Sequence, residues 1–470
     1  MNTKYIDFID QTFEFPQENI SLKGSNLLFH GIDLMSLVGQ YGSPLKFTLL
    51  PKIPENINKT KAWFRTAFEK TDYRARYHYC YCTKSSHFEP IIQEVIKNDV
   101  HIEISSNFDI DIVGRLIRQN KIDRNTYIIC NGFKQPEYVN SIASLINGGH
   151  DRCIPVLDNF EELTHLCRTV VGKLSIGLRI ASEEKPKFEF RTSRLGIGYQ
   201  DIVPFYKYSI KDNNKVTLKM LHFFINTGIS DSSYYWSELK KCLRIYVELK
   251  RICPSLNSLN IGGGLPIKNS LGFDYDYQGI IQSIVDLIGT VCTKAKIPYP
   301  DIFTEFGSFT VGESGGVIFK VLEQKYQNDT EKWYIIDSSF INTLPDTWAI
   351  NKKFMMLPLN GWHDHYEKVL LGGLTCDGDD YYSNEGCAND LYLPKFQQER
   401  PLYIGFFNTG AYQEAISGYG GLQHCLIPHP QHILIDKDEN GLLSTTLFKN
   451  RQKSEELLDI LGYETTKQVI

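Results

Sequence analysis

The sequence predicts an α/β protein in which a (β/α)8 barrel is followed by a β domain. Eight short segments rich in β-branched and aromatic residues alternate with helix-length amphipathic segments between residues 77 and 307. After Gly307 the pattern changes to strands joined by turns, without regular helices. Eight strand–helix units over about 250 residues are typical of a closed barrel, whereas an open doubly wound sheet usually has fewer strands.

The predicted barrel strands follow one another in order along the chain. They are residues 77–85, 101–107, 126–133, 152–159, 174–180, 220–226, 258–264 and 301–307. Segments such as EPIIQEVIKN and SELKKCLRIYVELKRI lie between them and carry apolar residues three and four positions apart, as in helices. Residues 43–53 also have a strand pattern and can return to the β domain. We therefore predict an N-terminal helix and strand joining the β domain over 1–54, the barrel over 55–308 and the β domain over 309–470.

The composition excludes several classes of protein. With 42% hydrophobic residues and a formal net charge of −5, the chain has the material for a large core and no basic field for nucleic acid. No apolar run is long enough for a membrane span, and the N-terminus has acidic residues where a signal peptide would be apolar. The eleven cysteines are scattered singly, apart from Cys80 and Cys82, with no paired metal-ligand spacing. This pattern predicts free thiols in a reducing cytoplasm and no metal site.

Three features fall where a barrel places its chemistry, at the carboxyl ends of the strands. Lys84 ends the first predicted strand in an apolar and aromatic setting, which suits an amine that forms a Schiff base. The run Gly262–Gly264 ends the seventh strand, where backbone N–H groups can approach a phosphate. Glu305 ends the eighth strand, where an acid can keep a pyridine nitrogen protonated. Taken singly, each has an ordinary alternative: a rim lysine, a plain turn and a rim carboxylate.

Taken together, and in this order, the motifs resemble the fold type III pyridoxal-phosphate decarboxylases, whose barrel is of the alanine racemase type. That family includes the ornithine, diaminopimelate and arginine decarboxylases. The segments IICNGFKQPEY, FINTLPDTWAINKKF, LTCDGD and YIGFFNTGAYQE are most similar to the biosynthetic arginine decarboxylases. The resemblance runs from about Gly42 to Gln413 and implies pyridoxal 5′-phosphate as the cofactor.

The resemblance also implies a role for individual residues. Lys84 matches the lysine that holds the cofactor, and Cys376 matches a proton donor that the partner subunit inserts into the site, so a homodimer with shared active sites is expected. Asp346 and Asp377 match substrate-binding acids. A basic residue at Arg194 matches one that pairs across the dimer with the acid at Asp380. Cofactor contacts are expected from Lys84, Glu103, Arg179, Phe224, Thr227, Gly262, Gly263, Gly264, Glu305, Ser308 and Tyr412.

Two departures from the family pattern concern cofactor contacts. The family places a histidine on the pyridine face, whereas this chain reads HFFINT, which puts Phe224 there and Thr227 at a serine position. His222 lies on the same strand face as Phe224, so it is the alternative stacking residue. The family's phosphate-binding arginine is replaced by Ser308, which gives one hydrogen bond in place of a bidentate charge pair.

The predicted reaction is α-decarboxylation of a basic or N-substituted basic L-amino acid. Arginine would place the enzyme in polyamine biosynthesis, and an N-substituted ornithine such as N-citrylornithine would place it in siderophore biosynthesis. Two alternatives remain open: an amino-acid racemase on the same barrel, and a non-catalytic homologue that only binds. The Cys376–Asp377 pair disfavours the racemase, and retention of Lys84, Glu305 and Cys376 disfavours the binding protein.

Overall fold

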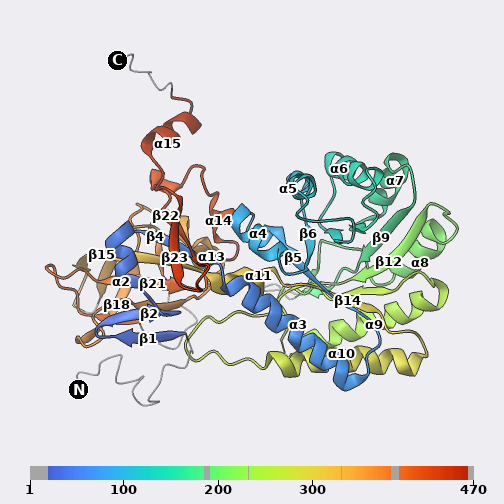
Figure 1. Ribbon diagram of the computed structural model, residues 1–470, viewed down its shortest axis with the longest axis horizontal. Helices are drawn as coiled ribbons and strands as arrows, with labels where there is room; N and C mark the ends of the chain where they lie inside the picture. The colour runs from blue at the N-terminus through green and yellow to red at the C-terminus, as the bar shows by residue number, and fades with distance from the viewer. Residues whose placement is uncertain (1–18, 185–190, 231, 330, 383–390, 464–470) are drawn as a thin grey trace. The chain divides into compact units, whose positions relative to one another are not determined.

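The computed structural model describes residues 19–184, 191–230, 232–329, 331–382 and 391–463 (Figure 1). The chain forms two compact units. The barrel unit consists of Ile53–Pro266 and Tyr275–Thr310, and the β unit consists of Met1–Lys52, Ile267–Asp274 and Val311–Ile470. The short segment Ile267–Asp274, which lies inside the predicted barrel range, therefore groups with the β unit.

The barrel unit contains a closed ring of eight strands, all paired in parallel, as the sequence predicts. The ring runs in chain order and closes where the eighth strand pairs with the first. Seven of the predicted segments contain a whole observed strand, whereas the sixth, 220–226, overlaps only the last three of the seven residues of its strand. Every observed strand ends before the predicted carboxyl end. The strands are β5 (Tyr77–Cys82), β6 (His101–Ile104), β7 (Ile128–Cys130), β8 (Cys153–Leu157), β9 (Leu174–Arg179), β12 (Val216–His222), β13 (Ser258–Asn260) and β14 (Asp301–Glu305).

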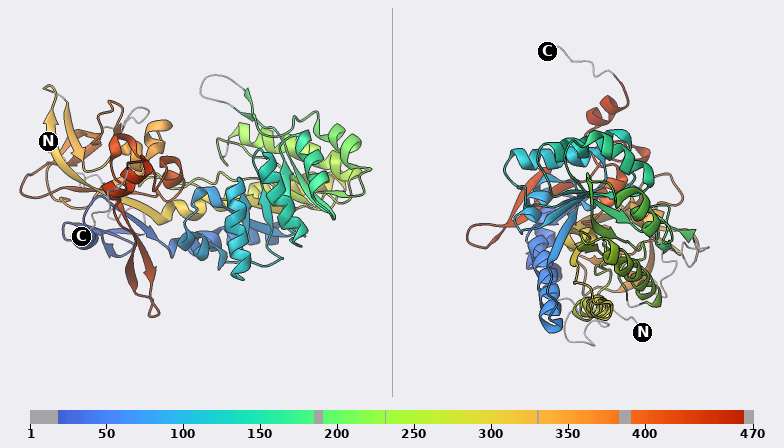
Figure 2. Two further views of the ribbon diagram at one scale, coloured as in Figure 1. Left: turned by 90° about the horizontal axis from the view of Figure 1, so that it is seen from above. Right: turned by 90° about the vertical axis from the view of Figure 1, so that its right-hand side faces the viewer.

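Amphipathic helices lie outside the ring of strands (Figure 2). Their starts are fixed by side chains that accept hydrogen bonds from the first backbone N–H groups, such as Ser106, Asn159 and Asp276. No helix among the described residues is both long and apolar enough to cross a membrane. The main helices are α3 (Lys52–Thr71), α4 (Glu89–Ile96), α5 (Asn107–Arg118), α6 (Pro136–Asn147), α7 (Phe160–Thr169), α8 (Ile202–Phe205), α9 (Ser233–Ile252) and α10 (Tyr277–Ala295).

The β unit is built on one large sheet with the strand order β19-β18-β16-β15-β4-β22-β23. The predicted strand at 43–53 is β4, which pairs antiparallel with β15 and parallel with β22 and so lies inside the sheet. A small antiparallel sheet precedes it, formed by β1 (Ile20–Lys23), β2 (Asn26–Phe29) and β3 (Ile32–Asp33) and followed by α2 (Leu34–Tyr41). The strands of the large sheet and its partners are β4 (Leu45–Leu49), β15 (Gly315–Tyr326), β16 (Lys332–Ile336), β17 (Met355–Pro358), β18 (Tyr366–Gly372), β19 (Tyr381–Tyr382), β20 (Leu391–Pro394), β21 (Tyr403–Phe407), β22 (Gln431–Lys437) and β23 (Leu443–Lys449).

The prediction that the β domain lacks regular helices is wrong. Short helices occur at α12 (Phe340–Thr343), α13 (Pro345–Ala349), α14 (Gln413–Ser417) and α15 (Ser454–Ile460). The first two begin at standard signals, because the Ser339 side chain caps α12 and Pro345 opens α13. These two helices span only four and five residues, which is too short for an apolar repeat to show in the sequence.

The core of the β unit is formed by apolar side chains from the sheet and from the N-terminal segment. Phe29, Phe47 and Phe407 pack against one another there, with ring centroids 4.8–6.4 Å apart. Trp362 lies in the same cluster and is fully buried, and its indole N–H donates to the carbonyl of Pro358 at 3.0 Å. The N-terminal and C-terminal parts of the chain therefore share one core.

We expect Trp362→Ala to lower the free energy of unfolding of the β unit by about 3–5 kcal/mol, because it leaves a large cavity and an unpaired carbonyl. Urea denaturation followed by circular dichroism measures the change. Trp348, which is 51% exposed on α13, is the matched control, and Trp348→Ala should change the value by less than about 0.5 kcal/mol. Equal effects of the two substitutions would contradict this description of the core.

Candidate active site

Polar side chains gather at the carboxyl ends of the barrel strands. Lys84 lies in the short 3-10 turn η2 (Thr83–Ser85) that follows β5, Glu103 lies in β6, and Glu305 is the last residue of β14. Because β14, β5 and β6 are adjacent in the barrel, these three residues come from neighbouring strands. The structure thus brings the predicted cofactor lysine and two predicted acids into one place.

Lys84 forms an ion pair with Glu103, its Nζ donating to Oε2 of the carboxylate. The Glu103 side chain is fully buried, whereas the Lys84 side chain is 38% exposed. The turn that carries the lysine is fixed by Thr83, whose hydroxyl bonds with the Glu103 carbonyl at 3.2 Å and with the Asp109 carboxylate at 3.0 Å. The amine is therefore held against a buried acid by a side chain that stays partly exposed.

Glu305 is held by a network of buried side chains. Asn131 bridges the two acids, with its amide nitrogen 3.0 Å from Glu103 Oε1 and 2.9 Å from Glu305 Oε1. Asn260 donates to the same Glu305 oxygen at 2.7 Å, and His222 Nε2 lies 3.6 Å from Glu305 Oε2. Asn131 directly follows β7, and Asn260 and His222 end β13 and β12, so the strands position the carboxylate directly.

The network keeps Glu305 ionised. Burial alone raises the pKa of this carboxyl, but the nearby His222, Lys84 and Asn131 outweigh burial and lower the pKa to about 2. Such a carboxylate suits the predicted role of holding a pyridine nitrogen protonated. Two buried polar atoms beside it, Asn131 Oδ1 and His222 Nδ1, have no hydrogen-bond partner among the described residues. Their bonding capacity, with the ion pair of Lys84, fits a polar ring such as that of pyridoxal phosphate.

The glycines of the Gly262–Gly264 run are required by the backbone itself. Gly262 and Gly264 have φ angles of +68° and +98°, which favour glycine. A Cβ at Gly263 would lie 2.2 Å from the Glu305 carbonyl oxygen, and one at Gly264 would lie 2.6 Å from Gly228 Cα. The three glycines thus let the loops after β12, β13 and β14 approach closely, and their contact with a phosphate stays a prediction.

The remaining barrel residues of the predicted site lie around β9 and β12. The guanidinium carbon of Arg179, at the end of β9, is 5.9 Å from the centroid of the Phe224 ring. Phe224 also lies over the glycine run, because a Cβ at Gly262 would be 3.1 Å from a carbon of its ring. Thr227 is exposed, and Ser308 is half-buried in α11 (Gly307–Val311). His222 contacts Glu305 and Phe224 contacts Arg179, so the choice of stacking residue stays a prediction.

Four predicted site residues belong to the β unit. Asp346 is buried and already engaged there, with its carboxylate 2.8 Å from Gln413 Nε2 and 3.1 Å from Lys352 Nζ. Tyr412 precedes α14 and has a φ of +70°. Cys376 is exposed, and the neighbouring Asp377 is 3.7 Å from His424.

Asp380 has a role within its own unit that the sequence does not reveal. It is 4% exposed, and its carboxylate accepts hydrogen bonds from the backbone of Phe340 at 2.8 Å and from the Thr375 hydroxyl at 2.7 Å. Arg194 is exposed on the barrel unit. The predicted pairing of Asp380 with Arg194 of the partner subunit stays a prediction.

Sequence reasoning missed Asn131 and Asn260, which position Glu305. The signal was available, since Asn131 directly follows β7 and Asn260 is the last residue of β13. Polar residues at the carboxyl ends of barrel strands are candidates for the site by the same rule that selects Lys84 and Glu305.

We expect Glu305→Gln to reduce the pH dependence of stability on the acid side. A carboxyl whose pKa falls on folding from its ordinary 4.5 to about 2 stabilises the fold above pH 4.5, and this contribution is lost as the pH falls towards 2. Urea denaturation should therefore show the difference between wild type and Glu305→Gln shrinking by on the order of 3 kcal/mol across this interval. Glu137→Gln, on the exposed face of α6, is the control and should follow wild type. A constant difference would show that Glu305 is not held as an anion.

Comparison with known proteins agrees with this geometry. A family model described as pyridoxal-dependent decarboxylase, pyridoxal binding domain, matches residues 55–312, which is more than half of the chain. The biosynthetic arginine decarboxylase of Prochlorococcus marinus is 22% identical over 584 aligned residues, covering 96% of this chain and 88% of that protein.

Solved structures share the fold at low identity. The biosynthetic arginine decarboxylase of Campylobacter jejuni superposes with a TM-score of 0.79 at 19% identity, covering 96% of this chain and 90% of that one. The diaminopimelate decarboxylase of M. jannaschii in complex with L-lysine superposes with a TM-score of 0.78 at 18% identity, covering 95% and 98%. The fold predicted from the sequence, a barrel with a β domain, is therefore confirmed. This chain belongs to the pyridoxal-dependent decarboxylases, a family of carboxy-lyases whose cofactor is pyridoxal phosphate.

Proposed function

We propose that this protein removes the α-carboxylate of a basic or N-substituted basic L-amino acid, releasing carbon dioxide and the corresponding amine. The observation that carries the proposal is the arrangement of Lys84 against two buried carboxylates, of which Glu305 stays ionised. When bound, pyridoxal phosphate supplies the electron sink for the electron pair left by the departing carboxylate.

Residues of the barrel unit would bind and orient the cofactor, each at a different part of it. Lys84 would hold the cofactor, and Glu305, fixed by Asn131 and Asn260, would hold its ring nitrogen. Phe224 would cover one face of the ring and Arg179 would lie beside it. Glu103 forms an ion pair with the Lys84 amine and so would orient it.

The proton that replaces carbon dioxide on the α-carbon would come from Cys376 of a second subunit. The thiol is exposed, as a group that reaches another chain must be. Tyr412, Thr227, Ser308 and the glycine run are the remaining proposed cofactor contacts. We propose a homodimer on this basis.

We propose two candidate substrates, each on its own ground. Arginine is supported by the relatives, which are named biosynthetic arginine decarboxylases, and it would serve polyamine biosynthesis. An N-substituted ornithine such as N-citrylornithine, for siderophore biosynthesis, is supported by the departures at Phe224 and Ser308. Asp377 is the better candidate to meet a substrate cation, because Asp346 is already paired with Lys352.

The proposed function predicts carbon dioxide release from one substrate of a panel containing arginine, ornithine, lysine, diaminopimelate and N-citrylornithine, read by product mass.

Borohydride reduction and peptide mapping should place a pyridoxyl group on Lys84, because this lysine lies at the carboxyl ends of the barrel strands. Lys84→Ala should abolish both signals, and Lys97→Ala, an exposed lysine beyond α4, should retain them. A pyridoxyl group on another lysine would refute the assignment, and no carbon dioxide from any substrate would refute the function.

Shared active sites predict complementation between two inactive variants. When Lys84→Ala and Cys376→Ala proteins are mixed, heterodimers contain one intact site, so about a quarter of wild-type activity should return if subunits exchange freely. The control mixes Lys84→Ala with Glu305→Ala, whose defects both lie in the barrel unit, and should recover nothing. Equal recovery in the two mixtures, or none in either despite demonstrated exchange, would exclude the shared site.

A further inference from the structure

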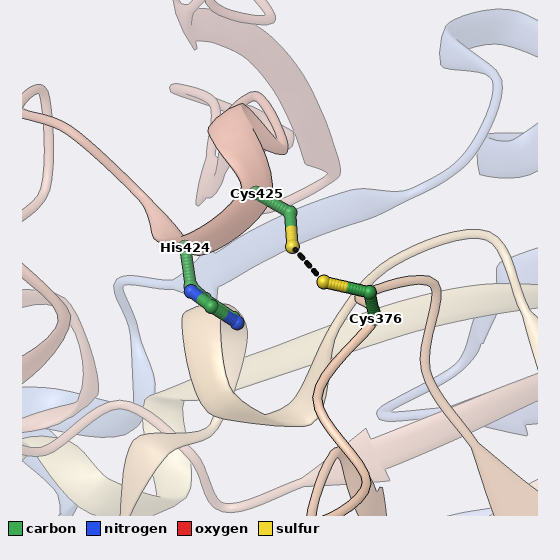
Figure 3. A group of neighbouring side chains, drawn as sticks. All are labelled: Cys376, His424 and Cys425. Carbon is green, nitrogen blue, oxygen red and sulfur yellow. Dashed lines mark hydrogen bonds between the residues drawn. The ribbon is translucent and has the colours of Figure 1, made fainter.

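Three metal-ligating side chains meet on the surface of the β unit. Cys376 lies in the loop after β18, and His424 and Cys425 open the 3-10 turn η5 (His424–Leu426) (Figure 3). All three are exposed, and their ligand atoms lie within 4.8 Å of one another. The two sulfur atoms are 3.4 Å apart, although 49 positions separate the cysteines in the sequence. Asp377 Oδ2 lies 3.7 Å from His424 Nε2 at the same place.

Buried polar contacts hold the Cys376 loop and the turn that carries His424 and Cys425 against the same helix, α12. Asp380 receives backbone N–H groups of Phe340, at 2.8 Å, and of Thr375, at 3.1 Å, and so ties the Cys376 loop to the start of α12. Asn342 binds the backbone of His424 twice, donating to its carbonyl at 2.9 Å and accepting from its N–H at 3.1 Å. Asp380 and Asn342 are only 4% and 6% exposed. The cluster is therefore positioned by the interior of the unit.

The sulfur separation is close to that required by a shared metal ion. Two thiolates on a tetrahedral zinc ion, each about 2.3 Å from the metal, lie about 3.8 Å apart, so the sulfurs need to separate by only about 0.4 Å. A disulfide, at about 2.05 Å, requires an approach of about 1.4 Å. Two thiolates with an imidazole are a soft to borderline ligand set, which favours zinc over magnesium or calcium.

We propose that Cys376, His424 and Cys425 bind a zinc-class divalent cation, with the Asp377 carboxylate as the fourth ligand. Binding releases the thiol protons, so the affinity should fall as the pH falls.

A regulatory consequence rests on the proposed function. If Cys376 is the proton donor, a metal ion on its sulfur withdraws that donor from the reaction, so the cation would inhibit decarboxylation. The metal site itself does not depend on the reaction, and it can be measured without substrate.

The test is a zinc titration of the full-length, cofactor-loaded and reduced protein in competition with a chromophoric chelator. Wild type should bind one zinc ion per chain at this site, and Co²⁺ in its place should give a thiolate-to-cobalt charge-transfer absorption. Cys425→Ser and His424→Ala should each weaken zinc binding by about tenfold or more, because each removes a direct ligand. Cys167→Ser changes a half-buried cysteine of the barrel unit and should bind zinc as wild type does.

Zinc binding that is unchanged in Cys425→Ser would overturn the proposal, as would cobalt binding without the charge-transfer absorption. Loss of two thiols to a disulfide in air, with no zinc bound, would assign the pair to redox chemistry and also overturn it. Decarboxylation by the zinc-free protein is measured separately, so its absence would count against the proposed function and leave the metal site standing.

Discussion

The barrel unit depends on the burial of two carboxylates, Glu103 and Glu305, at the same end of one ring of strands. A buried anion is tolerated only when donors or cations replace the water that it loses, and two adjacent anions also repel each other. Lys84 compensates the first, His222 and Asn260 compensate the second, and Asn131 donates to both. Each of these side chains is therefore held by an ion pair or a hydrogen bond to one of the two carboxylates.

This requirement extends into the backbone. Asn260 accepts the N–H of Gly262 at 2.9 Å, and the N–H of Glu305 donates to the Gly262 carbonyl at 2.8 Å. Gly262 thereby connects Asn260, whose amide orients the Glu305 carboxylate, with the strand that carries Glu305. A larger residue at Gly263 would collide with the Glu305 carbonyl oxygen, so the glycines and the acid form one structural element.

The sequence predicted the barrel well because eight strand–helix units repeat one local pattern, and each strand shows in its own residues. The site was predicted in part. Lys84 and Glu305 stand out as charges at strand ends, whereas Asn131 and Asn260 are ordinary amides until the strands place them beside an acid. The short helix α12 was missed because one turn carries no periodicity. Cys376 and Cys425 show no metal-ligand spacing in the sequence, since they are 49 positions apart and meet only through folding.

Residues that match the family motifs also have structural roles that the motifs do not indicate. Asp346 and Asp380 match acids with expected roles at the substrate and at the dimer, yet both carboxylates are engaged inside the β unit. Asp380 fixes the loop that carries Cys376, so a substitution there would displace the thiol even if the acid never meets another subunit. Loss of activity in such a variant would therefore not identify a direct contact.

The place of β4 within the sheet imposes an order on synthesis. This strand leaves the ribosome before the barrel, but both strands that flank it, β15 and β22, are encoded after the barrel. At roughly 5–20 residues per second, the intervening stretch takes on the order of tens of seconds to emerge. Throughout that interval Leu45–Leu49, buried at every position in the finished sheet, has none of its final strand partners. The nascent chain thus carries an unpaired strand segment while the barrel is synthesised, and unpaired backbone groups of this kind are a template for pairing with another chain.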